Sequence, residues 1–317
     1  MAHPDADAGR FAVRETRARG FAQRYVRVGE GGVPLLAVHG WPESKRIWWR
    51  VLEPLAEAGF DVIAPDLRGF GDSEVGPPDD DRGDVVAHSR DLLALLDDLG
   101  VERAVLAAGD LGGPVIQDMA ARAPERTHRM VVFNTVVLPP PDAGPIARPP
   151  REATDYFGWQ ATEADALAAE LATPEARRRY ISTFYTSRHW AHPGAFLDDP
   201  DGRWGFGAGG EVVAFHTEPF GDAATFRASI RPYEAAVRPE LLVEAPLMGP
   251  NPDVEVLILH GTSDQVIGPD FDRAAAAVYP HHVGPFRLRD CGHFVPWEAP
   301  GPFTSGVRAF CRDLLAG

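Results

Sequence analysis

Short runs of apolar residues recur in both halves of the chain, and most of them lead into helix-like sequence. Six runs have the length and composition of buried parallel strands: 35–38, 62–64, 104–107, 130–133, 254–259 and 286–288. Residues 89–99 carry leucines at helical spacing and stop at Gly100. This alternation predicts an α/β protein with a mostly parallel, twisted sheet flanked by helices on both faces.

The pattern changes between residues 138 and 237. Two proline-rich stretches open this segment, and helical periodicity follows, most clearly at 163–171 and 174–185. We therefore predict a core in two parts, 1–137 and 238–317, with residues 1–20 flexible or at the sheet edge. A helical cap, 138–237, is inserted after the sixth core strand and lies over the carboxyl ends of the sheet. It is rich in aromatic residues: Tyr156, Phe157, Trp159, Tyr180, Phe184, Tyr185, Trp190, Trp204, Phe206, Phe215, Phe220, Phe226 and Tyr233.

Composition narrows the class of protein. The chain has 317 residues, 44% hydrophobic and 24% charged, as expected for a globular enzyme. Its net charge of −15 argues against nucleic acid and anionic membranes as partners. Two cysteines, no signal peptide and no long apolar run favour a cytoplasmic protein, either a monomer or a homodimer. We see no phosphate loop or Cys/His cluster, so no metal or organic cofactor is expected.

Loops that follow the predicted strands carry the residues that could do chemistry. Their sequences are HGWPES at 39–44, PDLRGFGDS at 65–73, AGDLGG at 108–113, HGTSD at 260–264 and CGHF at 291–294. The carboxyl ends of parallel strands meet at one edge of a sheet. We therefore expect these loops to converge there.

Asp110 is the most informative of these residues. It stands between Ala108 and Gly112 in a small-x-Asp-x-Gly pattern, and a sharp strand-to-helix turn of this kind raises its tip residue into an active site. A carboxylate at the tip attacks carbon and forms an ester. The chain order Asp110, Asp264, His293 places nucleophile, acid and histidine as in the α/β-hydrolase fold.

With these motifs the chain resembles α/β-hydrolases of the epoxide hydrolase branch, from about residue 21 to the C-terminus. The resemblance implies an eight-stranded sheet and hydrolysis of an ether bond. Asp110 would open the epoxide to an alkyl-enzyme ester, and His293, oriented by Asp264, would activate the water that hydrolyses this ester. The backbone N–H groups of Trp41 and Leu111 would bind the oxyanion.

Ring opening also needs an acid for the leaving alkoxide, and a phenol of pKa ~10 can donate a proton at neutral pH. Epoxide hydrolases use two cap tyrosines, and the resemblance places them at Tyr233 and Tyr156. A histidine fills the first position in some relatives, so His189, His192 and His216 stay open as alternatives.

The resemblance also indicates a pocket for a small apolar epoxide, aryl-substituted or lipid-like, and water. Gly109, where relatives often carry histidine, indicates unusual space beside the nucleophile. His39 is expected mainly to hydrogen-bond loop backbone. The expected pocket residues are His39, Trp41, Pro42, Trp159 and Phe294.

Three alternatives remain open. Haloalkane dehalogenases share the aspartate turn but follow it with a tryptophan that holds the halide, where this chain has Leu111. Fluoroacetate dehalogenases place arginines at the positions of Leu111 and Pro114. A non-catalytic receptor for a small ligand is the third, and the complete triad argues against it. Asn134 follows the sixth strand, where some relatives carry the acid, but an amide has no charge to offer His293.

Overall fold

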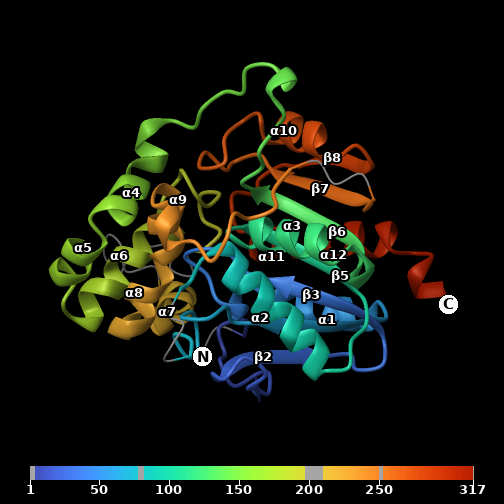
Figure 1. The fold of residues 1–317 in the computed structure, drawn as a ribbon, viewed down its shortest axis with the longest axis horizontal. Coiled ribbons are helices and arrows are strands. Elements are labelled where there is room, and N and C mark those ends of the chain that lie inside the picture. Colours follow the sequence, from blue (N-terminus) through green and yellow to red (C-terminus); the bar gives the residue numbers. More distant parts are fainter. Residues whose placement is uncertain (1–3, 78–81, 197–209, 250–252, 317) are drawn as a thin grey trace.

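A sheet of eight strands runs through the centre of the molecule (Figure 1), and its spatial order is β1-β2-β4-β3-β5-β6-β7-β8. The computed structural model describes residues 4–77, 82–196, 210–249 and 253–316, so Trp204 and Phe206 lie outside the described residues. β2 is antiparallel to β1 and β4, and the other neighbours are parallel. The strands are Arg14–Thr16 (β1), Gln23–Val28 (β2), Val33–Val38 (β3), Phe60–Pro65 (β4), Ala104–Asp110 (β5), Thr127–Thr135 (β6), Val256–Gly261 (β7) and His282–Leu288 (β8).

Every residue of β4, β5 and β7 is buried. Successive side chains of a strand point to opposite faces, so both faces of the central sheet are covered. α2 packs against α3, α1 against α12, and α10 against β7 and β8. These core helices are Trp49–Glu57 (α1), Val85–Asp98 (α2), Gly112–Arg122 (α3), Phe271–Val278 (α10), Val295–Glu298 (α11) and Pro300–Phe310 (α12). The predicted α/β architecture with a mostly parallel eight-stranded sheet is confirmed.

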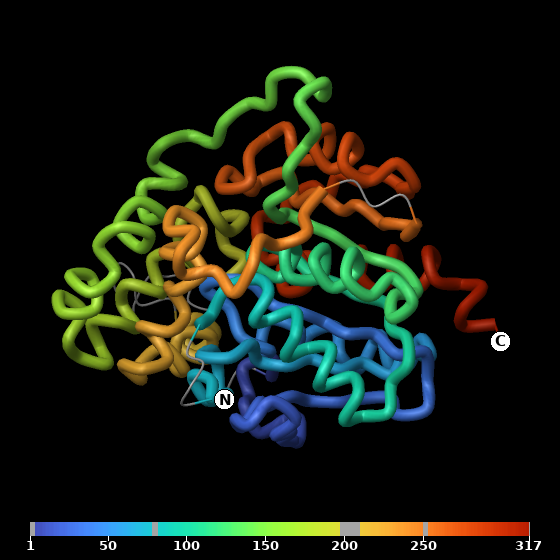
Figure 2. The backbone as a smooth tube through the Cα atoms, in the orientation of Figure 1, coloured from blue at the N-terminus to red at the C-terminus, as the bar shows by residue number. Residues whose placement is uncertain are grey.

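A group of helices between β6 and β7 lies together at one end of the sheet (Figure 1). We call α4–α9 the helical insertion. Figure 2 shows the long arm of chain that leaves β6 and reaches α4 without crossing the sheet. The bounds are Arg151–Thr162 (α4), Ala164–Glu170 (α5), Pro174–Thr186 (α6), Gly210–Thr217 (α7), Ala223–Ser229 (α8) and Arg231–Val237 (α9).

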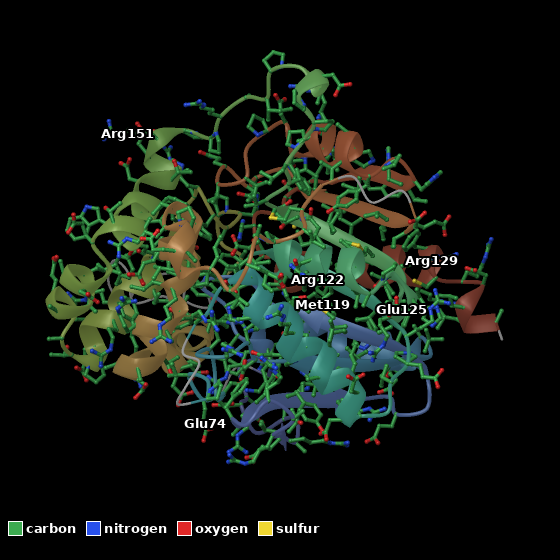
Figure 3. The ribbon with its side chains drawn as sticks, viewed as in Figure 1. Glu74, Met119, Arg122, Glu125, Arg129 and Arg151 are labelled. Carbon is green, nitrogen blue, oxygen red and sulfur yellow. The ribbon has the colours of Figure 1, made fainter. Side chains whose placement is uncertain are left out.

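Many charged side chains lie on the outside of the molecule. Glu74 and Arg151, labelled in Figure 3, have side chains that are 53% and 90% exposed. Within the described ranges, no helix combines the length and the apolar character needed to cross a membrane.

Candidate active site

Asp110 is the last residue of β5, and the chain turns sharply after it into α3. Asp110 has a φ of 43°, in the left-handed region that few non-glycine residues adopt. A Cβ on Gly112 would lie 2.7 Å from the carbonyl oxygen of Val38, and one on Gly40 would lie 2.4 Å from the Asp110 Cβ. Because both positions are glycine, the start of α3 and the loop after β3 can approach this closely around the carboxylate.

The structure brings His293 and Asp264 to this carboxylate from two other loops. His293 Nδ1 lies 2.8 Å from Asp264 Oδ2, and its Nε2 lies 3.3 Å from Asp110 Oδ2. The other oxygen of Asp264 accepts from the N–H groups of Val266 and Ile267, at 2.7 and 3.3 Å, so this acid also closes its own turn. Burial opposes the charged form of His293, but the two carboxylates outweigh it and raise its pKa well above the ordinary value.

The N–H of Trp41 donates to Asp110 Oδ1 at 2.7 Å. Leu111 is the residue directly before α3, and its side chain reaches the cavity described below. The first N–H groups of a helix have no partner within the helix. The Trp41 N–H therefore contacts the carboxylate directly, and the Leu111 N–H as a second donor stays a prediction.

Tyr156 of α4 and Tyr233 of α9 face Asp110 from the helical insertion. Their rings meet edge-on with centroids 5.8 Å apart, and the negative charge of Asp110 acts on both. The Trp41 ring stacks on Tyr156 with centroids 5.4 Å apart and meets Tyr233 edge-on at the same distance. Burial raises the pKa of each phenol well above its ordinary value, so both stay protonated at neutral pH.

A cavity of about 490 Å³ opens between the core and the helical insertion. Most of its walls are apolar, and none of the described residues around it is Lys, Arg, His or Trp. The polar exceptions are Asp84, Asp110, Thr154, Tyr156 and Tyr233. It is lined by Asp84, Val85, Asp110, Leu111, Pro114, Val136, Leu138, Thr154, Tyr156, Phe157, Pro232, Tyr233, Ala235, Ala236, Leu242, Pro246, Met248, Val266 and Ile267.

The five residues expected in the pocket are not among those that line this cavity. His39 is buried behind it, where its ring contacts the Gly40 carbonyl at 2.8 Å and accepts from the Leu67 N–H at 3.0 Å. Trp159 is 52% exposed on α4. Trp159 follows Tyr156 by three residues, so both lie on about the same face of α4, yet the indole extends into solvent and does not line the cavity.

Trp41, Pro42 and Phe294 form the layer behind the cavity wall. Trp41 supports the two tyrosines, and Pro42 accepts a hydrogen bond from Tyr185 at 2.6 Å. Phe294 stacks on Tyr185 with ring centroids 4.7 Å apart. The five residues predicted to line the pocket are therefore replaced by the cavity residues named above, from Asp84 to Ile267.

The space expected beside Gly109 is filled. A Cβ at this position would lie 2.3 Å from Cε2 of Phe133 on the neighbouring strand β6. The absent side chain makes room for a core ring, and it does not enlarge the cavity.

The three histidines that were left open as alternatives to a tyrosine do not line the cavity. His189 Nδ1 lies 2.7 Å from Gln265 Oε1, and His192 Nδ1 lies 3.0 Å from Ser263 Oγ. His216 is buried among aromatic rings, and burial lowers its pKa well below the ordinary value.

Two carboxylates near His293, the buried Glu43 and the partly buried Glu298, were not assigned a role from sequence. Glu43 accepts from the Gly40 N–H at 2.5 Å, and burial raises its pKa to about 7. Glu298 accepts from the N–H groups of Gly292 and Phe294, the neighbours of His293, at 2.7 and 3.0 Å. Glu43 stands in the HGWPES motif, but only the folded loops show what these oxygens contact.

The sheet order and the Asp–His–Asp arrangement at its carboxyl edge define an α/β hydrolase. Residues 33–300 match the alpha/beta hydrolase fold family, and the chain belongs to this family. It is similar to Epoxide hydrolase A of Mycobacterium tuberculosis, with 29% identity over 320 residues that cover 93% of this chain and 95% of that protein.

Two further comparisons cover different parts of the chain. A match to Bifunctional epoxide hydrolase 2 of Mus musculus is 35% identical over 128 residues, 40% of this chain, and spans only 23% of that longer protein. The solved structure of the epoxide hydrolase CorEH without ligand superposes with a TM-score of 0.77 at 24% identity, covering 96% of this chain and 99% of that one. This second likeness is one of fold.

Proposed function

We propose that the protein hydrolyses a small apolar epoxide to a vicinal diol through an ester on Asp110, with the helical insertion acting as its cap. One observation carries this proposal: a carboxylate beside His293 faces two adjoining tyrosines across an apolar cavity. The carboxylate provides a nucleophile for carbon, and the phenols provide an acid for oxygen. An epoxide needs both at once.

In the first step, Asp110 Oδ2 attacks an epoxide carbon, and the carbon–oxygen bond of the ring breaks. The electron pair stays on the leaving oxygen, which takes a proton from Tyr233 or Tyr156. Oδ1, held by the Trp41 N–H, becomes the carbonyl oxygen of the ester. The tyrosine donors contribute a factor of about 10² to 10⁴ if they behave as ordinary general acids.

In the second step, water attacks the ester carbonyl carbon while His293 takes its proton. The Trp41 N–H then stabilises the oxyanion on Oδ1. As this intermediate collapses, the bond between the carboxyl carbon and the alkyl-bearing Oδ2 breaks, and the diol leaves with the proton held by His293. The proton of the new carboxyl group restores the tyrosine phenol, which regenerates the Asp110 carboxylate. Ester formation removes the charge of Asp110, which is one of the two carboxylates that raise the pKa of His293. Alkylation thus lowers the pKa of His293 at the stage when a base is required.

The cavity favours this reaction over dehalogenation. A departing halide or a bound carboxylate needs N–H or cationic donors, and the described residues around the cavity include no Trp, Arg or Lys. Leu111 and Pro114, at the positions where dehalogenases hold such groups, present apolar surface.

Trapping the ester tests the mechanism. We expect His293→Gln, incubated with styrene oxide, to gain one substrate mass at Asp110, because alkylation proceeds and hydrolysis lacks its base. The double variant Asp110→Ala/His293→Gln is the control and should keep its unmodified mass. If His293→Gln stays unmodified while the wild type forms diol, the ester mechanism is wrong. Parallel assays with a bromoalkane and fluoroacetate should show no turnover.

A further inference from the structure

Gly292, the residue before His293, has both its backbone N–H and its carbonyl oxygen hydrogen-bonded to side chains of other segments. The Gly292 N–H donates to Glu298 Oε2 at 2.7 Å, and its carbonyl accepts from Asn134 Nδ2 at 2.8 Å. A Cβ on Gly292 would lie 2.4 Å from the carbonyl oxygen of Trp190. The peptide that leads into the histidine is therefore fixed from three directions.

Glu298 of α11 makes most of these contacts. Besides Gly292, its Oε2 accepts from the His192 N–H at 2.8 Å, and its Oε1 accepts from the Phe294 N–H at 3.0 Å. One carboxylate thus holds the residue on each side of His293. Hydrogen bonds from backbone N–H groups to a carboxylate are stronger than those between neutral groups, and their geometry sets where the intervening residue lies.

The same carboxylate connects the histidine loop to the segment that follows α6 of the helical insertion. His192 lies in this segment, and the carbonyl of Trp190 accepts from the His293 N–H at 2.7 Å. The rings of Trp190 and His293 also meet, with centroids 4.7 Å apart. The segment after α6 and the loop that carries His293 are therefore packed directly against each other.

Asn134 completes the arrangement from β6. Its oxygen accepts from the Gly261 N–H at 2.9 Å, at the end of the strand that precedes Asp264. Its Nδ2 contacts the Gly292 carbonyl, next to His293. The Asn134 amide thus connects the loop that carries Asp264 to the loop that carries His293.

We propose that Glu298 is a positioning residue for ester hydrolysis: by fixing Gly292 and Phe294 it holds the His293 ring where it can activate water against the Asp110 ester. Asn134 supports the same peptide from the opposite side. This role rests on the proposed function. A general base acts only within hydrogen-bond reach of the proton it takes, and a displacement of 1 Å can cost about a hundredfold in rate. Nucleophilic attack by Asp110 does not require that reach.

Glu298→Gln tests this role with little change in shape. Its amide group replaces one of the two acceptor oxygens, so at least one of the three N–H donors loses its partner. We expect the rate of ester hydrolysis to fall about tenfold or more, with the alkylation rate within about twofold of wild type. Ester should then accumulate at Asp110 during turnover of styrene oxide, as read by intact mass and single-turnover quenching.

Asp118→Asn is the matched control, because Asp118 is a buried carboxylate that also holds backbone, together with a side chain. It accepts from the Leu247 N–H at 2.8 Å and from Arg122 at 2.7 Å, on the side of α3 away from His293. Loss of folded protein lowers both rates equally. This control should therefore lose stability without accumulating ester.

Asn134→Gly is a second variant, which stays informative if Glu298→Gln does not fold. Glycine tolerates the φ of 35° at this position, so only the amide contacts are lost. Ester accumulation is again expected. Normal ester hydrolysis in Glu298→Gln, with ester trapped in His293→Gln, overturns the positioning role. If His293→Gln traps no ester either, the proposed function itself fails.

Discussion

Trp41 contacts both kinds of group that the proposed reaction uses, the carboxylate and the two phenols. Its backbone N–H reaches Asp110, and its ring contacts both Tyr156 and Tyr233. A shift of this one residue would move the carboxylate and the two phenols together. In the proposed reaction, Trp41 of the HGWPES motif therefore contacts both the carboxylate and the two phenols.

Removing the hydroxyl of Tyr233 should slow the alkylation of Asp110 and leave the hydrolysis of the ester unchanged. We expect Tyr233→Phe to lower the alkylation rate by about a hundredfold or more, since the leaving alkoxide loses a donor. Ester hydrolysis, which uses His293, should stay unchanged, and single-turnover quenching with styrene oxide separates the two rates. Tyr279→Phe is a matched control, because the buried Tyr279 hydroxyl has no hydrogen-bond partner among the described residues. Equal slowing of both steps would exclude Tyr233 as the acid.

The carboxyl of Glu43 should make stability depend on pH. Its pKa is raised from 4.5 to about 7 in the folded protein by burial, which outweighs the opposing effects of His293 and the Gly40 N–H. Between these values the folded state holds more protons than the unfolded state, so the free energy of unfolding falls as pH rises through this window. The slope is at most about 1.4 kcal/mol per pH unit.

Glu43→Gln isolates this contribution. The amide oxygen can still accept from the Gly40 N–H, and the titration is gone. We expect the variant to gain stability relative to wild type as pH rises from about 4.5 to about 7, and the difference to level off above that. Urea unfolding across this range measures it, and parallel pH profiles for the two proteins would contradict the prediction.

Among residues, the sequence predicted those whose chemistry depends on motif and chain order. Asp110, Asp264 and His293 do meet, because parallel strands deliver their loops to one edge of the sheet. Glu298 was not predicted, since its importance lies in three backbone N–H groups whose positions depend on loop packing. The cavity lining was missed for a related reason: Val85 and Met248 reach it from segments far from any motif.

At the level of elements, the continuous apolar runs predicted the six central and C-terminal parallel strands. The structure adds β1 and β2, which the apolar runs do not show. β2 mixes polar and apolar residues along Gln23–Val28 with no continuous apolar run, and β1 has three residues at the edge of the sheet. β8 begins at His282, four residues before its apolar run, because an edge strand tolerates polar residues.

Close packing between β5 and β6 makes Gly109 a sensitive position. A methyl group there would meet the ring of Phe133 at 2.3 Å, so we expect Gly109→Ala to lower the free energy of unfolding by about 1–3 kcal/mol. Gly158 in α4 is the control, because a Cβ there meets nothing within 4 Å. Gly158→Ala should raise stability by about 0.5–1 kcal/mol through helix propensity. Urea unfolding of both variants is the measurement, and equal effects would contradict the packing argument.

For the whole molecule, two features act on the charge of a substrate. The chain carries a net charge of −15, and the described lining of the cavity contains no cationic side chain. Repulsion between the net negative charge and an anionic substrate acts at long range and is screened by salt. Burying a charge in a cavity without a cationic partner costs desolvation free energy, which salt does not remove. The two can therefore be separated by ionic strength.

A pair of styrene oxides that differ only at the para position tests which feature controls selectivity. We expect the para-carboxylate to show a kcat/KM at least about a hundredfold below that of its methyl ester, because burying an unpaired carboxylate costs several kcal/mol. The ratio should persist when ionic strength is raised to about 1 M, where charges separated by more than about 3 Å are screened. The methyl ester at both salt concentrations controls for effects of salt on the enzyme. If high salt abolishes the difference, long-range repulsion by the acidic surface, and not the apolar cavity, selects the substrate.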